Sequence, residues 1–458
     1  RHDCEKEGER ANRDLRGVGS CGRRILSFML PLLFGLLFQQ FYSMVDTVVV
    51  GKFLGVEALA GVGSTGSVNF LVLGLCNGVC AGFAIPVAQK FGQRDFDGLR
   101  RFVGNMIWLG CVIAAAVTLV TTLLCRQILL WMDTPADTFS YAYDYIFVIF
   151  LGIPATMLYN LLSGILRSLG DSKTPLVFLI MCSLLNVALD IVFILTLNMG
   201  VAGAGWATLL SQLISGVLCL YFIVKKFPIL HLKQDDLRLR KIYVRKLLNM
   251  GLPMGLQYSI TAVGSILLQT AVNGLGATAM AAIAAGSRVS MLLVCPFDAM
   301  GTTAATFAGQ NLGAGKLDRI HQGIKDCTVL GIIISAAIFV ITWFGGSAMT
   351  TLFLDKEEGA SVDMVVPMGQ QFLLINAAFA IPLLFVNLLR FTIQGLGEWM
   401  AFCSKPKPMR IVLTPSICSN EEMIGILPPR RAAKGRLPKA TSKPFSAALY
   451  AGISIGQT

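Results

Sequence analysis

Charged side chains are scarce in this sequence. Asp, Glu, Lys and Arg make up 14% of the 458 residues, whereas a soluble globular protein carries about 25%. Hydrophobic residues make up 55% of the chain, and the mean hydropathy is +0.68. This balance excludes an ordinary soluble domain and predicts an integral membrane protein that lies in a lipid bilayer.

The patterns that carry chemistry in soluble enzymes are missing as well. The 12 Cys show neither metal-ligand spacing nor a disulfide framework. The glycines of "GVAGAGWAT" at 200–208 do not form G-x-G-x-x-G, and no P-loop or catalytic triad is found. We therefore expect neither an enzyme nor a bound cofactor. Basic loops are present, but we expect them to report orientation in the membrane and not a nucleic-acid partner.

Long apolar segments dominate what is present. A helix needs about 20 apolar residues to cross a bilayer, and ten segments are long enough. They lie at 25–50, 58–88, 102–126, 139–165, 175–197, 201–224, 247–273, 277–309, 322–349 and 364–396. Residues 1–22 are polar, so we expect no cleavable signal peptide. The predicted fold is an all-α polytopic membrane protein with ten spans.

Lys and Arg alternate between the loops. They are concentrated before the first span and in the loops after the second, fourth, sixth and eighth spans, while the other loops hold only Lys52, Arg126 and Lys356. Basic residues favour the cytoplasmic side of a membrane. We therefore predict a multi-pass protein of the cell membrane, with its N-terminus and even-numbered loops in the cytoplasm.

The chain also repeats itself. The motif Gln89-x-x-Gly92 recurs 221 residues later as Gln310-x-x-Gly313. Further pairs are Leu54-Gly55 with Leu275-Gly276, and Asn160-Leu161-Leu162 with Asn387-Leu388-Leu389, the last at an offset of 227. One unit holds six helices, so the second copy keeps the same orientation. In transporters with such parallel repeats, substrates bind between the two halves.

The repeat divides the chain into five parts. We predict a charged cytoplasmic tail at 1–24, a six-helix N-lobe at 25–224, a basic linker at 225–246 and a partial C-lobe of four helices at 247–398. Residues 399–458 are basic and rich in Pro, and form no apolar segment of spanning length. They are either translated out of frame or a real basic tail on anionic lipid. We expect a chain whose second lobe has only four helices to transport poorly.

Two acidic residues lie in the middle of apolar segments. Asp46 lies within 28–50 and Asp190 within 175–197. A carboxylate is expensive at this depth, and intramembrane acids commonly mark ion or proton pathways. The alternative is a structural hydrogen bond or a helix-end carboxylate that faces water. The position of both acids in mid-segment favours a function in handling cations or protons.

Several motifs resemble those of the MATE (multidrug and toxic compound extrusion) family. The segment "PLLFGLLFQQFYSMVDTVVVGKFLG" at 31–55 is similar to the first helix of that family. "AQKFGQRD" and "GQNLGAGK" resemble its paired loop motifs, "ILRSLGDSKTP" the end of its fourth helix, and "LNVALDIVFI" its fifth helix. The resemblance covers 25–398, and the motifs occur in the expected order.

The resemblance implies two six-helix lobes around a central cleft, and exchange of Na⁺ or H⁺ for small organic compounds that are expelled. Its motifs place the coupling cation at Asp46, Asn186, Asp190 and Thr208. Two nearby carboxylates in a medium of low dielectric cannot both stay ionised without a cation, and in its absence at least one should hold a proton. The sequence does not decide between H⁺ and Na⁺. For Asn186 and Thr208, hydrogen bonding between helices is the alternative.

The second lobe offers weaker candidates. Part of the family carries an acid on the seventh helix, where this sequence has Gln257 in "GLPMGLQYS". Asp298 on the eighth predicted helix is the clear acid of this lobe, although it and Arg288 could simply neutralise each other. We keep Gln257 and Asp298 as secondary site candidates.

Three functions are compatible with these observations. The first is a multidrug-efflux antiporter that works as a monomer. The second is a flippase for lipid-linked oligosaccharide from a related branch of the superfamily, which the paired acids disfavour. The third is a membrane scaffold, in which two buried carboxylates would have no purpose.

Overall fold

The computed structural model describes residues 20–273, 277–352 and 362–397. All of these belong to the first of two compact units, residues 1–408. The predicted tail at 399–458 and most of the tail at 1–24 lie outside the described residues. Where the structure describes the chain, regular secondary structure is helical throughout, as predicted.

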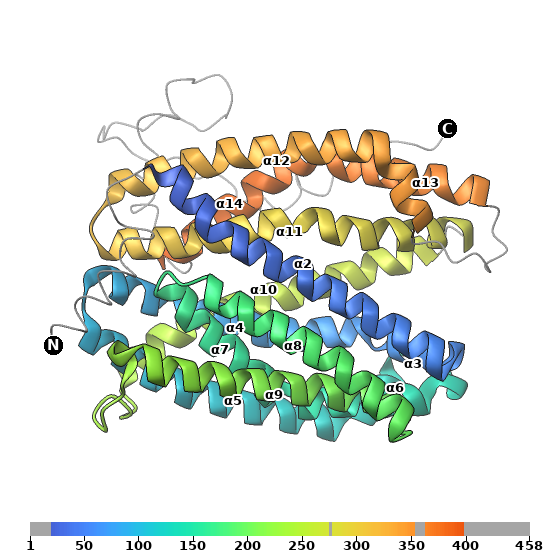
Figure 1. Cartoon of the computed structure of the whole chain (residues 1–458), viewed down its shortest axis with the longest axis horizontal. Coiled ribbons are helices and arrows are strands. Elements are labelled where there is room, and N and C mark those ends of the chain that lie inside the picture. The colour runs from blue at the N-terminus through green and yellow to red at the C-terminus, as the bar shows by residue number, and fades with distance from the viewer. Residues whose placement is uncertain (1–19, 274–276, 353–361, 398–458) are drawn as a thin grey trace, which may run out of the picture. The chain divides into compact units, whose positions relative to one another are not determined.

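Most of the helices are long and run side by side (Figure 1). They are α2 (Cys21–Leu54), α3 (Val56–Ser64), α4 (Gly66–Gln93), α5 (Phe96–Trp131), α6 (Ala136–Leu151), α7 (Ile153–Ser168), α8 (Lys173–Ile191), the π-helix η1 (Val192–Thr196), α9 (Gly200–Lys226), the 3₁₀-helix η2 (Pro228–Leu230), α10 (Lys241–Asn273), α11 (Ala277–Gly313), α12 (Leu317–Leu352), α13 (Val362–Ala378) and α14 (Ala380–Leu396).

The ten predicted spans each fall on a helix or on a pair of consecutive helices. By length and apolar composition, seven described helices could cross a membrane, or nine if two bent pairs each count as one span. The bent pairs are α6 with α7, at 45°, and α13 with α14, at 48°. Helix α10 is not among these helices. The ten-span arrangement therefore stays a prediction.

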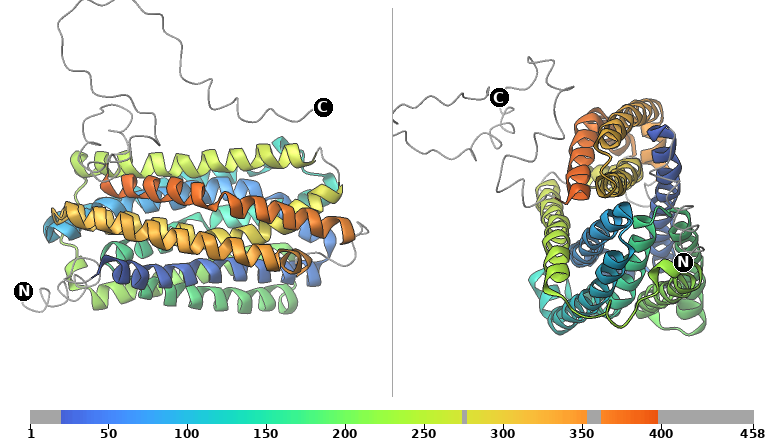
Figure 2. Two further views of the ribbon diagram at one scale, coloured as in Figure 1. Left: turned by 90° about the horizontal axis from the view of Figure 1, so that it is seen from above. Right: turned by 90° about the vertical axis from the view of Figure 1, so that its left-hand side faces the viewer.

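The helices pack in two groups (Figures 1 and 2). In the first, α4 contacts α5 and α7, and α9 contacts α6, α7 and α8. In the second, α11 contacts α12, α13 and α14. Helix α10, which the repeat places in the second lobe, packs mainly along α4 of the first.

Glycines explain how closely α4 and α10 approach. A Cβ built on Gly82 would lie 2.6 Å from the Cα of Gly251, and one built on Gly78 would lie 2.7 Å from the Cα of Gly255. Small residues let helix backbones come together in a membrane, where apolar surface alone gives no preference for protein over lipid. Any larger residue at these four positions would push the two helices apart.

Helix α2 belongs to both groups. Its first half contributes Cys21, Ile25, Phe28 and Met29 to a buried cluster with side chains of α11, α12, α13 and α14. Its last turns contribute Val49 and Val50 to a different cluster, with side chains of α3, α6, η1 and α9. Figure 1 shows this dark blue helix running obliquely across both groups.

The linker between α9 and α10 is held against α5. Asn105, whose side chain is fully buried, donates to the carbonyl of Arg238 at 3.3 Å and accepts from the backbone N–H of Arg240 at 3.0 Å. Trp108 donates to the carbonyl of Leu237 at 3.0 Å. Asp236 lies 3.4 Å from the Nε of Arg100. The predicted linker is thus an ordered, docked segment in its central part.

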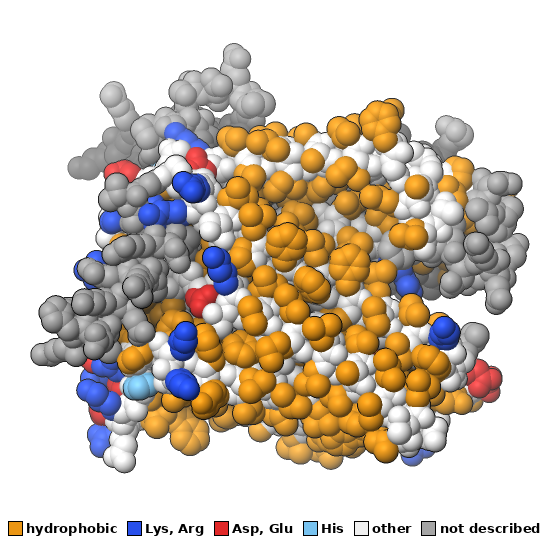
Figure 3. Space-filling model, viewed as in Figure 1, with side chains coloured by type: hydrophobic (Ala, Val, Ile, Leu, Met, Phe, Trp, Pro, Cys, Tyr) orange, Lys and Arg blue, Asp and Glu red, His pale blue; other side chains and the backbone are white. Residues whose placement is uncertain are grey.

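The surface suits a bilayer. Large apolar side chains are exposed along the helices, with Phe344 84% and Leu123 73% accessible. Figure 3 shows this apolar surface over the middle of one face, and Lys and Arg gathered toward its left-hand end. An apolar band between polar ends is what a lipid environment requires of a helical protein.

Candidate functional site

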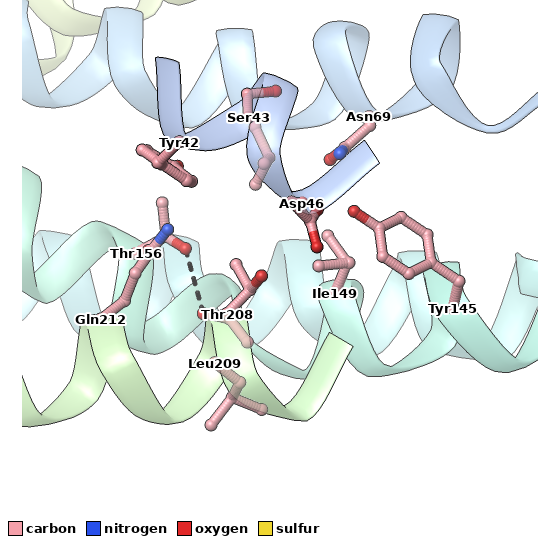
Figure 4. Close-up of a pocket in the computed structure, with 12 residues that line it drawn as sticks. Tyr42, Ser43, Asp46, Asn69, Tyr145, Ile149, Thr156, Thr208, Leu209 and Gln212 are labelled. Carbon is pink, nitrogen blue, oxygen red and sulfur yellow. Dashed lines mark hydrogen bonds between the residues drawn. The ribbon is translucent and has the colours of Figure 1, made fainter. Parts of the chain in front are cut away.

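A pocket opens between α2, α4, α6, α7 and α9 (Figure 4). Its lining residues, which include the charged Asp46, come from helices that are distant in sequence. The lining residues are Tyr42, Ser43, Asp46, Asn69, Leu73, Tyr145, Ile149, Gly152, Thr156, Thr208, Leu209 and Gln212. The pocket therefore contains Asp46 and Thr208, two of the four cation ligands predicted from the sequence.

Asp46 on α2 and Asp190 at the end of α8 are close enough for their carboxyl groups to interact. Asp46 lines the pocket, whereas Asp190 is not among the lining residues. Asp190 is fully buried. Neither oxygen of Asp190 has a hydrogen-bond partner among the described residues, and the same holds for Oδ1 of Asp46. Buried carboxylate oxygens without donors are costly, so this pair suits a proton or a cation as the missing partner.

Asn186 and Thr208 complete the group of predicted ligands. The side-chain amide of Asn186 donates to Oγ1 of Thr208 at 3.3 Å, which leaves the buried Oδ1 of Asn186 without a donor. Asn186 and Asp190 are one turn apart, so they lie on one face of α8. The structure thus brings all four predicted residues together. It also places a π-helix, Val192–Thr196, two residues after Asp190, a feature that recurs at functional sites.

The chemistry of these ligands limits which ions fit. They are carboxylate, amide and hydroxyl oxygens, which suit hard cations. Within the described ranges, no group of three or more His, Cys, Asp or Glu side chains could hold a metal ion. Asp46, Asn186 and Asp190 fit Na⁺ through their oxygens, and the two carboxyls could equally share a proton. The arrangement itself does not choose between the two ions.

Ten of the twelve pocket residues were not predicted. Among these ten, Asn69 and Gln212 each present a buried side-chain oxygen that has no donor in the described part of the chain. Tyr42 and Tyr145 are also among them. A sequence signal existed for Tyr42, one turn before Asp46, and for Gln212, one turn after Thr208, because residues four apart share a helix face. Nothing in the sequence connects Asn69 or Tyr145 to the site.

The secondary candidates lie elsewhere. Gln257 on α10 accepts a hydrogen bond from Gln394 on α14 at 2.7 Å. If its amide is turned over, its oxygen instead accepts from Nε of Arg390 at 3.2 Å. Asp298 on α11 is within electrostatic range of the same Arg390, not paired with Arg288 as the sequence suggested. Neither Gln257 nor Asp298 lines the pocket that contains Asp46.

Comparisons with known proteins agree with this architecture. Both halves of the chain match the family model MatE, at residues 31–192 and 253–402. The probable multidrug resistance protein YoeA of Bacillus subtilis is 28% identical over 346 residues, which cover 74% of this chain and 75% of YoeA. The FAD transporter of Shewanella oneidensis is 23% identical, over 72% of this chain and 74% of that protein.

Solved structures show the same fold. One describes the outward-facing conformation of a multidrug resistance MATE family transporter; it matches with a TM-score of 0.78 and 23% identity, over 85% of each chain. Another, of MATE in complex with MaL6, has a TM-score of 0.78 and 23% identity, over 84% of this chain and 85% of that chain.

Proposed function

The chain belongs to the MatE family of transporters, and we propose that it exports small organic compounds from the cell in exchange for H⁺ or Na⁺. The observation that carries the proposal is the cluster of buried oxygens without donors at Asp46, Asn186 and Asp190. A transporter that couples two fluxes needs such a site, because the ion must bind tightly enough to be taken up and be released on the other side.

We further propose ten spans in two lobes, with the N-terminus and the 225–246 linker in the cytoplasm. The basic loops support this orientation. Substrate would bind between the lobes, which alternately open toward either side. The protein would work as a monomer in the cell membrane.

The ion would act through the charge of the carboxyl pair. With a proton or Na⁺ bound, Asp46 and Asp190 are held together. After release, two like charges remain in a medium of low dielectric and repel each other. Asp46 is on α2 and Asp190 is on α8, so this repulsion acts between two helices. An ion shifts a conformational equilibrium only by its difference in affinity for the two states. The change in charge of the carboxyl pair supplies this difference in affinity.

The cargo is proposed from the names of relatives. YoeA is named for probable multidrug resistance and MepA of Staphylococcus aureus for multidrug export, whereas the Shewanella protein carries FAD. We propose multidrug export as the function. The oligosaccharide-flippase alternative finds no support in the names of these relatives.

The first prediction tests the carboxyl pair. Asp46→Asn and Asp190→Asn should each reduce coupled efflux at least tenfold in everted vesicles, because an amide cannot bind or release the proton or replace the charge. Asp144→Asn is the matched control, since Asp144 is exposed on α6 and does not line the pocket. Efflux driven by a pH gradient or by a Na⁺ gradient, each imposed alone, identifies the coupling ion. Near wild-type efflux in both variants would exclude the assignment.

A further inference from the structure

The last turns of α4 and α11 meet backbone to backbone. A Cβ built on Gly92 would lie 3.0 Å from the Cα of Gly313, and a Cβ built on Gly313 would lie 3.0 Å from the Cα of Gly92. The first Cβ would also collide with the carbonyl oxygen of Gln310, and the second with that of Gln89. Both contacts belong to the paired motifs Gln89-x-x-Gly92 and Gln310-x-x-Gly313.

Each glutamine of these motifs forms a hydrogen bond across to the other half of the repeat. Gln89 on α4 donates to the carbonyl of Gly395 on α14 at 3.1 Å, and Gln310 on α11 donates to the carbonyl of Ser168 on α7 at 2.7 Å. Gln89 is 7% exposed and Gln310 1%. Lys246 donates to Oε1 of Gln89 at 3.3 Å, which orients this amide with its N–H groups toward Gly395.

The two acceptors are equivalent as well. Ser168 is the last residue of α7, and Gly395 is in the last turn of α14. Carbonyls in the last turn of a helix have no partner within the helix. Ser168 and Gly395 are 227 residues apart, the offset at which this part of the repeat aligns. The same glutamine-to-carbonyl hydrogen bond therefore occurs twice between the two halves. In one case the first half donates, and in the other the second half donates.

Because the two hydrogen bonds are buried, they favour two alternative states of the helix ends. While the helix ends are together, both side-chain amides and both carbonyls are shielded from water and hydrogen-bonded to each other. If the ends separate fully, water satisfies all four groups, so opening remains possible. A partial separation leaves buried groups unpaired, which is less favourable than either end state. The bonds therefore favour a fully closed or a fully open arrangement over an intermediate one.

We propose that Gln89, Gln310 and the carbonyls of Ser168 and Gly395 form a glutamine latch that closes the transport path at the end of the protein where Lys90, Lys246 and Lys316 lie. The inference rests on the proposed transport function. Asn69, in the ion pocket, is 20 residues before Gln89 on the same helix α4, or about 30 Å away. The latch is therefore remote from the ion. In this proposal it controls which side of the membrane the pocket faces.

A labelling experiment tests the latch without requiring transport. Ala88 is 3% exposed and faces Gly309 at this interface. In a background without native cysteines, an Ala88→Cys side chain should react slowly with a membrane-impermeant maleimide applied to inside-out vesicles. Gln89→Ala or Gln310→Ala should each raise the labelling rate about fivefold, the effect of one hydrogen bond of about 1 kcal/mol. The double variant should label about 25-fold faster if the two bonds add.

Two further variants sharpen the test. Gln310→Glu keeps the shape of the side chain but removes the N–H donor, so it should label at least as fast as Gln310→Ala. Gln93→Ala removes an exposed glutamine from the same last turn of α4 and should label like the parent. If all latch variants label within twofold of the Gln93→Ala control, the latch does not exist.

A cross-link tests the same closure without removing any glutamine. A Cβ on Gly309 would lie 3.5 Å from the Cβ of Ala88, within the range of about 3.5–4.5 Å that disulfides need. Ala88→Cys with Gly309→Cys should oxidise to a disulfide and stop efflux until a reductant is added. Failure to cross-link, or full efflux in the cross-linked protein, overturns the proposal. A failed latch with inactive Asp46 and Asp190 variants would leave the proposed antiport intact.

Discussion

At the scale of residues, the proposed ion site shows which neighbours a sequence can reveal. Asn186 and Asp190 are one turn apart on α8, and Asp46 and Thr208 were identified by motifs on α2 and α9; the structure brings the four together. Asn69 and Tyr145 could not be predicted, because α4 and α6 bring them to the pocket only through the tertiary packing of the helices. Spacing along a helix predicts neighbours on one face, but it does not predict which faces meet.

Thr208→Val tests the supporting role of a single hydroxyl. The variant keeps the shape of the side chain but removes the oxygen that accepts from Asn186 at 3.3 Å. One lost hydrogen bond of about 1 kcal/mol should weaken the apparent affinity for the coupling ion about fivefold and leave the maximal efflux rate close to that of the parent. The measurement is efflux against ion concentration.

The matched control is Thr351→Val. Thr351 is exposed on α12 and, among the described residues, bonds to the carbonyl of Ser347 in its own helix at 2.9 Å. An unchanged ion dependence in Thr208→Val, or an equal change in Thr351→Val, would exclude Thr208 from the site.

At the scale of elements, apolar segments predicted where helices lie but not where they break. The segment predicted at 58–88 is divided between α3 and α4 at Thr65, and the one predicted at 139–165 bends at Gly152 between α6 and α7. Helix α8 passes into a π-helix at Val192. Such breaks follow from local hydrogen-bond geometry and hardly alter composition, so an apolar pattern does not contain them.

The start of α5 provides a test of a helix cap. The carboxylate of Asp95 accepts from the backbone N–H of Gly98 at 2.9 Å and pairs with Lys90 at 2.7 Å. Asp95→Ala should destabilise the purified protein by about 1 kcal/mol, the usual effect of losing a cap of this kind. Asp97→Ala, which removes an exposed carboxylate of the same turn, should have a smaller effect. Thermal unfolding in detergent at neutral pH compares the variants.

The same cap should respond to acid. The hydrogen bond from Lys90 holds the pKa of Asp95 below its ordinary value. A lowered pKa in the folded protein means that the stabilisation is present above the unfolded pKa of about 4 and is lost as the pH falls through the folded value. The difference in melting temperature between the parent and Asp95→Ala should therefore shrink as the pH is lowered below 4. A constant difference would show that the carboxylate charge is unimportant there.

At the scale of the whole molecule, the docked linker connects the two halves of the repeat. Asn105→Ala removes the hydrogen bonds to the backbone of Arg238 and Arg240. We expect trypsin to cut the released linker at Lys233 or Arg238 several times faster than in the parent. Cleavage should occur in inside-out vesicles and not in intact cells, because we propose from the Lys and Arg distribution that this loop is cytoplasmic.

Asn376→Ala is the control for the linker. Asn376 is exposed on α13 and bonds at 3.0 Å to the carbonyl of Phe372 in the same helix, so this change should leave cleavage unaltered. Equal cleavage of the parent and Asn105→Ala would show that the linker does not depend on Asn105. Cleavage from outside intact cells would overturn the orientation.

The division of α2 between two buried clusters has a mechanical consequence. Its Met29 end is fixed among α11, α12, α13 and α14, and its Val49 end among α3, α6, η1 and α9. A straight, rigid helix cannot stay fixed to two bodies that rotate apart. Any rotation of one half against the other must therefore bend α2. Pro31 lies between the two anchors and lacks the N–H that would resist bending. Asp46 is on this same helix, so we expect binding of the coupling ion at Asp46 to be linked to the bending of α2.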